Sequence, residues 1–159
     1  MADRKVFTAA MFTAVLLLAG AFVLPRSFFL FELAKSSIYF AVAALVYYAE
    51  DRYGYMLGMV APPLWFAVDW MAGTLGHDFR ALGNFLVGRS IAPLETPLHA
   101  LARLAAVVLF ILSIRAWHRE VPEKIFGKPL WTGLAASLIY VGGLTAWYFF
   151  TYSAAAQAP

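Results

Sequence analysis

The chain of 159 residues is 63% hydrophobic, only 13% charged and free of cysteine. Soluble domains are about half apolar and a quarter charged, so this composition excludes an ordinary soluble fold and indicates an integral membrane protein. The lack of cysteine excludes disulfides, iron–sulfur clusters, thiolate zinc sites and thioether-linked haem. The net charge of +3 comes from Lys and Arg residues scattered at the ends of apolar segments, which argues against nucleic acid as a partner.

The length bounds the number of membrane spans. A transmembrane helix needs about 20 apolar residues, so residues 1–159 have room for a single domain with a bundle of about five transmembrane helices. The predicted fold is therefore an all-α, polytopic membrane protein. The predicted spans are residues 6–24, 28–49, 53–75, 97–117 and 130–152.

The first predicted span, residues 6–24, follows the basic pair Arg4 and Lys5. Its apolar run is longer than the ~7–15-residue core of a signal peptide, and no small-x-small cleavage site stands before Pro25. We therefore expect a retained span. It ends at Pro25 because proline cannot continue a helix.

The second predicted span, residues 28–49, has the shortest uninterrupted apolar stretch. A protein with four spans would result if this segment lay partly in the membrane interface. The third predicted span, residues 53–75, contains Asp69 and the pair Pro62-Pro63. Of two interpretations of the prolines, we favour a kink stabilised by neighbouring helices over a break that frees carbonyl groups for a lipid or pigment.

A short interfacial helix is predicted in the connection formed by residues 76–96. Asp78 stands ahead of apolar residues at helical spacing, which indicates a helix with this aspartate as its N-cap. We expect the helix to lie on the outer membrane surface. In the next span, residues 97–117, Thr96 is the expected N-cap and Pro97 the first helical residue.

The distribution of basic residues predicts the orientation of the chain. With five spans, the inner segments would hold Arg4, Lys5, Arg52, Arg115, Arg119, Lys124 and Lys128. The outer segments would hold Arg26, Lys35, Arg80 and Arg89. The larger inner set predicts a cytoplasmic N-terminus and a C-terminus on the opposite side of the membrane.

Asp69, His99 and Arg103 are the candidate polar cluster inside the membrane. Asp69 lies about six residues before the end of its predicted span and Arg103 about six after the start of the next, so antiparallel helices place them at one depth. His99 precedes Arg103 by one turn on the same helix face. Because a charge within a span costs about 2.5–3.5 kcal/mol, we expect Asp69 and Arg103 to form an ion pair.

Three further polar residues, His77, Asp78 and Glu95, are expected around the outer mouth of this cluster. The cluster is interpreted either as a structural salt bridge, which we favour, or as a functional track for a proton or polar substrate. A metal site from His77, Asp78 and His99 has no supporting ligand motif, so no metal ligands are assigned. No motif for nucleophilic catalysis is present, and no catalytic residue is assigned.

The positions of the histidines limit which cofactors the chain could bind. Haem and chlorophyll commonly use a histidine inside a span as axial ligand. Only His99 lies within a predicted span, and it lies near the end. This argues against a bis-histidine haem in the bundle and leaves open one pigment or haem at a subunit edge.

Small residues predict close contacts between helices. The pairs that do so are Gly54 and Gly58, Gly133 and Ser137, and Gly142 and Gly143. Short loops and the lack of a catalytic motif favour a non-catalytic accessory or structural subunit of a larger complex, such as a respiratory or photosynthetic assembly. Its partners would be the lipid bilayer and other membrane protein subunits.

The alternative is a small self-sufficient transporter or membrane enzyme that works through Asp69, His99 and Arg103. This function requires a cavity that reaches Asp69 from the outer face. A tightly packed, dry pair would instead agree with the accessory subunit.

Overall fold

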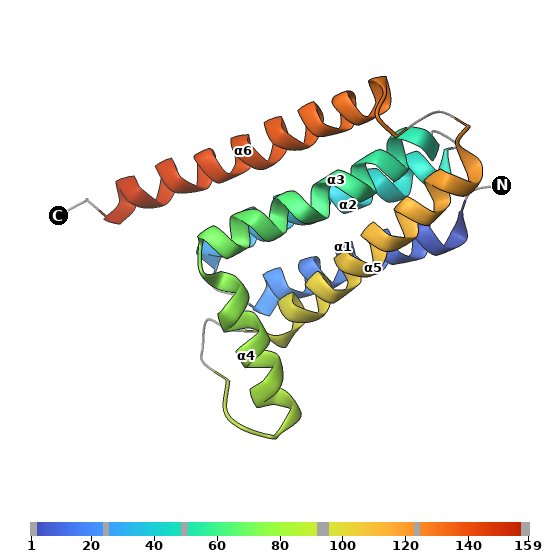
Figure 1. Cartoon of the computed structure of the whole chain (residues 1–159). Coiled ribbons are helices and arrows are strands. Elements are labelled where there is room, and N and C mark those ends of the chain that lie inside the picture. Colours follow the sequence, from blue (N-terminus) through green and yellow to red (C-terminus); the bar gives the residue numbers. More distant parts are fainter. Residues whose placement is uncertain (1–2, 24–25, 49–50, 92–95, 123–124, 157–159) are drawn as a thin grey trace.

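The computed structural model describes all residues except 1–2, 24–25, 49–50, 92–95, 123–124 and 157–159 (Figure 1). The described part of the chain is helical and contains no strand, which confirms the predicted all-α class. Its helices are α1 Arg4–Val23, α2 Arg26–Tyr47, α3 Asp51–Met71, α4 Thr74–Leu86, α5 Pro97–Glu120 and α6 Lys128–Ala156.

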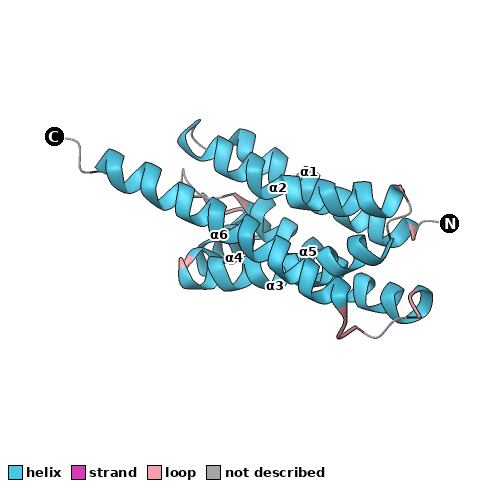
Figure 2. Cartoon of the chain, turned by 90° about the horizontal axis from the view of Figure 1, so that it is seen from above, coloured by secondary structure: helices cyan, strands magenta, loops and turns pink. Residues whose placement is uncertain are grey.

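The helices form a bundle with one outlying member. Helix α1 packs against α2 and α5, while α3 packs against α2, α5 and α6. Helix α4 is short and crosses the end of the bundle steeply (Figure 1). Helix α6 lies on the outside along α3, and its C-terminal part extends past the other long helices in both views (Figures 1 and 2).

Small side chains explain the close approach of α1 to its neighbours. Ala10, Ala14, Leu17 and Ala21 form one buried stripe on α1, with the three alanines fully buried. Alanine permits close backbone contact between helices in a membrane, where dispersion and not water exclusion favours association. The stripe therefore holds α1 against the bundle along most of its length.

Within the part of the chain that the structure describes, four helices have the length and apolar composition of membrane spans. They cover Arg4–Val23, Phe29–Tyr47, Pro97–Glu120 and Lys128–Thr151. The second predicted span is thus long and apolar enough, although its sequence is the one that suggested a four-span alternative. Helix α3 is outside this set even though it has 21 residues, because it is rich in Tyr, Trp, Pro and Gly, whose hydropathy is low.

The turn between α3 and α4 differs from the sequence prediction. Helix α3 ends at Met71 instead of residue 75, and α4 begins at Thr74. Gly73 adopts φ 71°, a left-handed conformation that glycine enters without steric cost, so the chain reverses early. The N-cap position is Gly73, and the prediction that Asp78 caps this helix is wrong because Asp78 lies more than one turn inside it.

Other local predictions agree with the structure. Thr96 caps α5, accepting a hydrogen bond from the Leu98 backbone nitrogen at 3.3 Å, and Pro97 is the first helical residue. Pro62 and Pro63 both lie within α3, which continues as an α-helix on either side of them. The alternative interpretation, a break that would free carbonyl groups, does not agree with this continuous helix.

The glycines divide into two groups. An added Cβ at Gly54 would stand 2.7 Å from a side-chain atom of α2, and Gly58 and Gly133 are similarly crowded by neighbouring helices. These three confirm the prediction of close helix contacts. Gly142 and Gly143 have nothing within 4 Å of an added Cβ, so the prediction is wrong for this pair, which lies where α6 faces open space.

Candidate functional site

Charged side chains gather where α4 crosses the end of the bundle. Six titratable residues from four helices lie there, each with only 6–9% of its surface exposed. They are Glu32 and Lys35 of α2, Asp69 of α3, Asp78 of α4, and His99 and Arg103 of α5. We call this set the charged cluster.

Asp69 is paired with two cations. Lys35 Nζ donates to its carboxylate oxygens at 3.1 and 3.2 Å, and Arg103 Nε donates to Oδ2 at 3.0 Å. The ion pair between Asp69 and Arg103 expected from the sequence is therefore present. Counting Lys35 with the outer segments is wrong, because α2 begins at Arg26 and carries Lys35 on a buried face, 5.0 Å from the Trp65 ring.

Arg103 links three helices. Besides Asp69, its guanidinium contacts the Asp78 carboxylate through Nη1 and donates to Thr74 Oγ1 from Nη2 at 3.4 Å. The Thr74 hydroxyl donates in turn to the Asp69 carbonyl at 3.2 Å. A planar guanidinium with five donors suits this role, since one side chain satisfies acceptors on α3 and α4 at once.

His99 lies between two carboxylates. Its Nε2 is 3.5 Å from Glu32 Oε2, and its Nδ1 is 4.0 Å from Asp78 Oδ1. Neither Nε2 nor Glu32 Oε2 has a hydrogen-bond partner among the described residues. Since both ring nitrogens face carboxylates, the imidazole is poorly placed as an axial ligand for a pigment or haem.

Gly20 makes room for this imidazole. A Cβ added at Gly20 of α1 would stand 2.6 Å from His99 Nε2 and 2.7 Å from Cδ2. Any other side chain at this position would have to displace His99. Helix α1 therefore also shapes the charged cluster, because Gly20 has no side chain and leaves space for His99.

A cavity adjoins the cluster. It has a volume of about 240 Å³ and is lined by all six members of the charged cluster, together with residues of the α3–α4 turn and of α6. Ala72 of the turn and Thr74, the first residue of α4, line the cavity and are both exposed, so the cavity opens there. Thr145 and Tyr148 of α6 form part of its wall.

A second, smaller cavity of about 20 Å³ lies against Asp69 on the side of Thr13 and Tyr39. It is large enough for about one water molecule. The Asp69 and Arg103 pair therefore adjoins space on more than one side and is not enclosed by tight packing.

The predicted outer-mouth residues have different positions. Asp78 belongs to the charged cluster, whereas His77 is exposed on α4. Glu95 lies outside the described residues. Among the residues that the structure describes, no group of three or more His, Asp or Glu side chains is arranged to hold a metal ion.

Sequence reasoning missed Glu32 and Lys35. A signal was present, because residues three apart in a helix share a face and opposite charges at this spacing attract each other. Lys35 was counted with the outer basic residues, and Glu32 was given no role. Gly20 carried no comparable signal, since its importance depends on the position of His99 in a different helix.

In comparisons with known proteins, no family model, no curated protein and no solved structure matches this chain. The function must therefore be inferred from the geometry of the site.

Replacing Gly20 by alanine is expected to destabilise the protein by about 1–3 kcal/mol, because the new methyl group overpacks His99. Gly143→Ala is the matched control, since its methyl group enters open space and alanine favours the helix by about 0.5–1 kcal/mol. Both changes would be measured as unfolding midpoints in the same detergent. Equal stability of the two variants would contradict this assignment of Gly20.

Proposed function

We propose that this chain is a small multi-pass membrane protein that binds a small substrate at the charged cluster, as a transporter or membrane enzyme. The observation that supports the proposal is the cavity of about 240 Å³ bordered by all six members of the charged cluster. A structural salt bridge needs only two charges in a dry contact. The accessory-subunit function, favoured by the sequence, becomes the second candidate.

The energetics of the cluster support a role beyond helix packing. Each charge held within a span costs about 2.5–3.5 kcal/mol, and buried ion pairs contribute little net stability compared with apolar residues of similar size. Besides His99, the cluster holds three acidic and two basic residues, so its formal charge is one negative when His99 is neutral. A proton or a cationic substrate would balance this excess.

A substitution that fills the cavity would test the proposal. Ala72→Trp places a bulky ring at the opening without removing a charge, and Ala41→Trp puts the same ring on an exposed face of α2 as the control. Native mass spectrometry of protein taken from its own membrane into nanodiscs would identify bound molecules. We expect a near-equimolar ligand with the native protein and Ala41→Trp, and its loss with Ala72→Trp. An equal ligand content in all three proteins would overturn the proposal.

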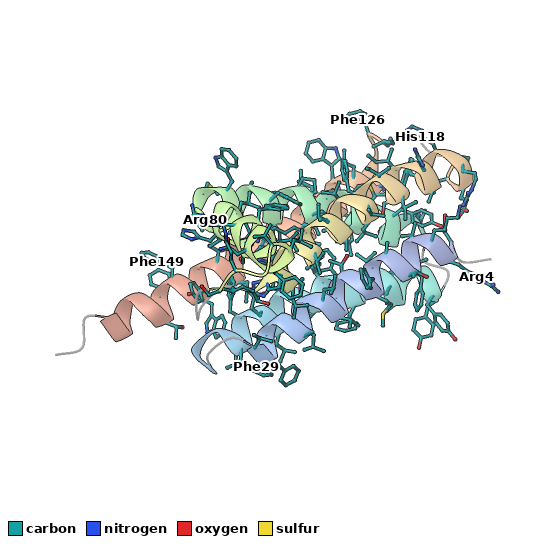
Figure 3. The ribbon with its side chains drawn as sticks, turned by 90° about the horizontal axis from the view of Figure 1, so that it is seen from below. Arg4, Phe29, Arg80, His118, Phe126 and Phe149 are labelled. Atoms are coloured by element: carbon teal, nitrogen blue, oxygen red, sulfur yellow. The ribbon has the colours of Figure 1, made fainter. Side chains whose placement is uncertain are left out.

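We further propose five spans, with α3 crossing the membrane beside α2 and α5, a cytoplasmic N-terminus and an exported C-terminus. The packing of α3 inside the bundle supports the fifth span. Figure 3 places Arg4 and His118 toward one end of the molecule and Arg80 toward the other. Lys35 is buried within α2, so it no longer counts among the outer basic residues. The excess of basic residues on the inner side is then larger.

Single cysteines would test this orientation cleanly, because the chain has none of its own. Arg89 and Phe126 are exposed and lie in opposite connections. In intact cells, a membrane-impermeant maleimide should label Arg89→Cys, and it should label Phe126→Cys only after lysis. The reverse pattern would invert the topology, and labelling of both in intact cells would contradict the number of spans.

The second candidate function is an accessory subunit of a membrane complex. The observation that favours it is the exposure of α6, where Ile139 is 76% and Phe150 71% exposed and Gly142 and Gly143 face open space. Another subunit's helix would fit this surface. Gentle extraction followed by a native gel should then show a large particle with defined partners, whereas a stable monomer or homo-oligomer would exclude this candidate.

A further inference from the structure

The cavity beside the charged cluster adjoins an apolar groove. The groove lies between α3 and α6, has a volume of about 550 Å³, and is lined mainly by aliphatic and aromatic side chains. Val68 of α3 and Thr145 of α6 line both the cavity and the groove. The two spaces therefore meet at one polar–apolar boundary.

We propose that the substrate is an amphiphile whose head occupies the charged cavity and whose apolar tail lies in the groove between α3 and α6. This inference rests on the proposed function and specifies its substrate class. The head is an amine or a hydroxyl group that donates hydrogen bonds. The molecule reaches the site from within the bilayer, past α6.

Unsatisfied polar atoms in the cavity wall indicate the chemistry of the head. Glu32 Oε2, His99 Nε2 and Thr145 Oγ1 are buried, line the cavity and make no hydrogen bond among the described residues. Glu32 Oε2 and His99 Nε2 lie 3.5 Å from each other, so a donor placed between them could bond to the carboxylate. Glu32 and His99 are both more than nine-tenths buried. A buried polar atom without a hydrogen bond lowers stability, and a bound head group would recover this loss.

The charge balance favours a donor over an anion. Lys35 and Arg103, the lysine and arginine of the cluster, are both already paired with Asp69, and Arg103 also contacts Asp78. A phosphate or carboxylate head would have to compete with these carboxylates. An ammonium or hydroxyl group instead finds the acceptor Glu32 Oε2, and an ammonium would also neutralise the excess negative charge.

The position of α6 favours access from the bilayer. Near its middle, α6 is held to α2 by the Tyr140 hydroxyl, which donates to the Ala34 carbonyl and lies 2.7 Å from the Ser37 hydroxyl. It contacts α2 again at Tyr148, whose ring lies 4.5 Å from that of Phe31, and its C-terminal end extends past the bundle (Figures 1 and 2). Figure 3 places Phe149, which lines the groove, toward the same end of the molecule as Arg80 of α4.

Two adjacent glycines provide a matched pair of variants. Gly142 lines the groove, whereas Gly143 does not, and neither has an atom within 4 Å of an added Cβ. Gly142→Trp would therefore fill the groove. Gly143→Trp would place the same ring on an open face of the same helix.

The experiment is photo-crosslinking in nanodiscs. The probes are long-chain alkylamine, alkanol and alkanoate molecules with a diazirine near the end of the chain, and labelled residues are mapped by peptide mass spectrometry. We expect the amine and alcohol probes to label the peptides that contain Met71 and Phe149 about tenfold more than the carboxylate probe, equivalent to ~1.4 kcal/mol. Gly142→Trp should reduce this labelling about tenfold, and Gly143→Trp should leave it unchanged.

The outcomes separate the inference from the proposed function. Retention of the native ligand by Gly142→Trp, together with its loss in Ala72→Trp, would overturn the tail assignment and leave the cavity site standing. Ligand retention in both variants would overturn both. Equal labelling by all three probes, or labelling spread over every lipid-facing helix, would show unspecific lipid contact and overturn the inference. The inference would also be overturned if another subunit or a second copy of the chain covered α6 and prevented the probe from labelling it.

Discussion

Replacing Asp69 by alanine is expected to lower the free energy of unfolding by about 3–5 kcal/mol, because it leaves buried cations without their carboxylate. Among the described residues, the ion-pair partner of Lys35 is Asp69, whereas Arg103 also contacts Asp78. The buried Lys35 ammonium would therefore lose the carboxylate that neutralises it. The loss would be measured by equilibrium unfolding in mixed micelles. Trp65, whose ring lies 5.0 Å from Lys35 Nζ, provides a fluorescence signal.

A second substitution separates the charge effect from the cavity left by the smaller side chain. Lys35→Met in the Asp69→Ala background removes the uncompensated cation and should recover more than half of the lost stability, since apolar replacement of a buried pair is often nearly neutral. Lys35→Met alone should destabilise less than Asp69→Ala because Arg103 still neutralises Asp69. A loss under about 1 kcal/mol for Asp69→Ala would instead indicate a water-screened pair.

The position of Asp69 could be predicted because the constraint was simple. A charge in an apolar span needs a partner at the same depth, and Arg103 was the cation at that depth on an antiparallel neighbour. The predicted depth of Asp69 within its helix was nevertheless wrong, since Asp69 lies only two residues before the end of α3 at Met71. It is buried there because Gly73 turns the chain so that α4 returns over the site.

The partners from α2 could not be placed in the same way. A helix that is apolar on most sides does not reveal which face meets the bundle, so the direction of Glu32 and Lys35 depends on how α2 is rotated against α3. The glycines of α6 illustrate the same limit. Gly133 and Gly142 look alike in sequence, but one packs against α3 and the other lies where the helices diverge.

Replacing Arg103 by methionine is expected to release α4 from the bundle. Only two residues of α4 are buried, Asp78 and Ala81, and Asp78 is held by Arg103. Methionine would leave that carboxylate without its cation, at a cost of about 3–5 kcal/mol that opening of α4 into water would relieve. Hydrogen exchange of the α4 amides should therefore accelerate about a hundredfold, while the amides at the centre of α5 remain protected.

Two variants distinguish loss of charge from loss of geometry at this residue. Arg103→Lys keeps the cation but lacks the planar fork that contacts Asp69, Asp78 and Thr74 together, so its effect on α4 exchange should be intermediate. Asp78→Asn in the Arg103→Met background removes the uncompensated carboxylate and should restore part of the protection. Unchanged α4 exchange in Arg103→Met would mean that apolar contacts around Ala81 anchor the helix. The wall of the cavity formed by α4 would then not depend on the charged cluster.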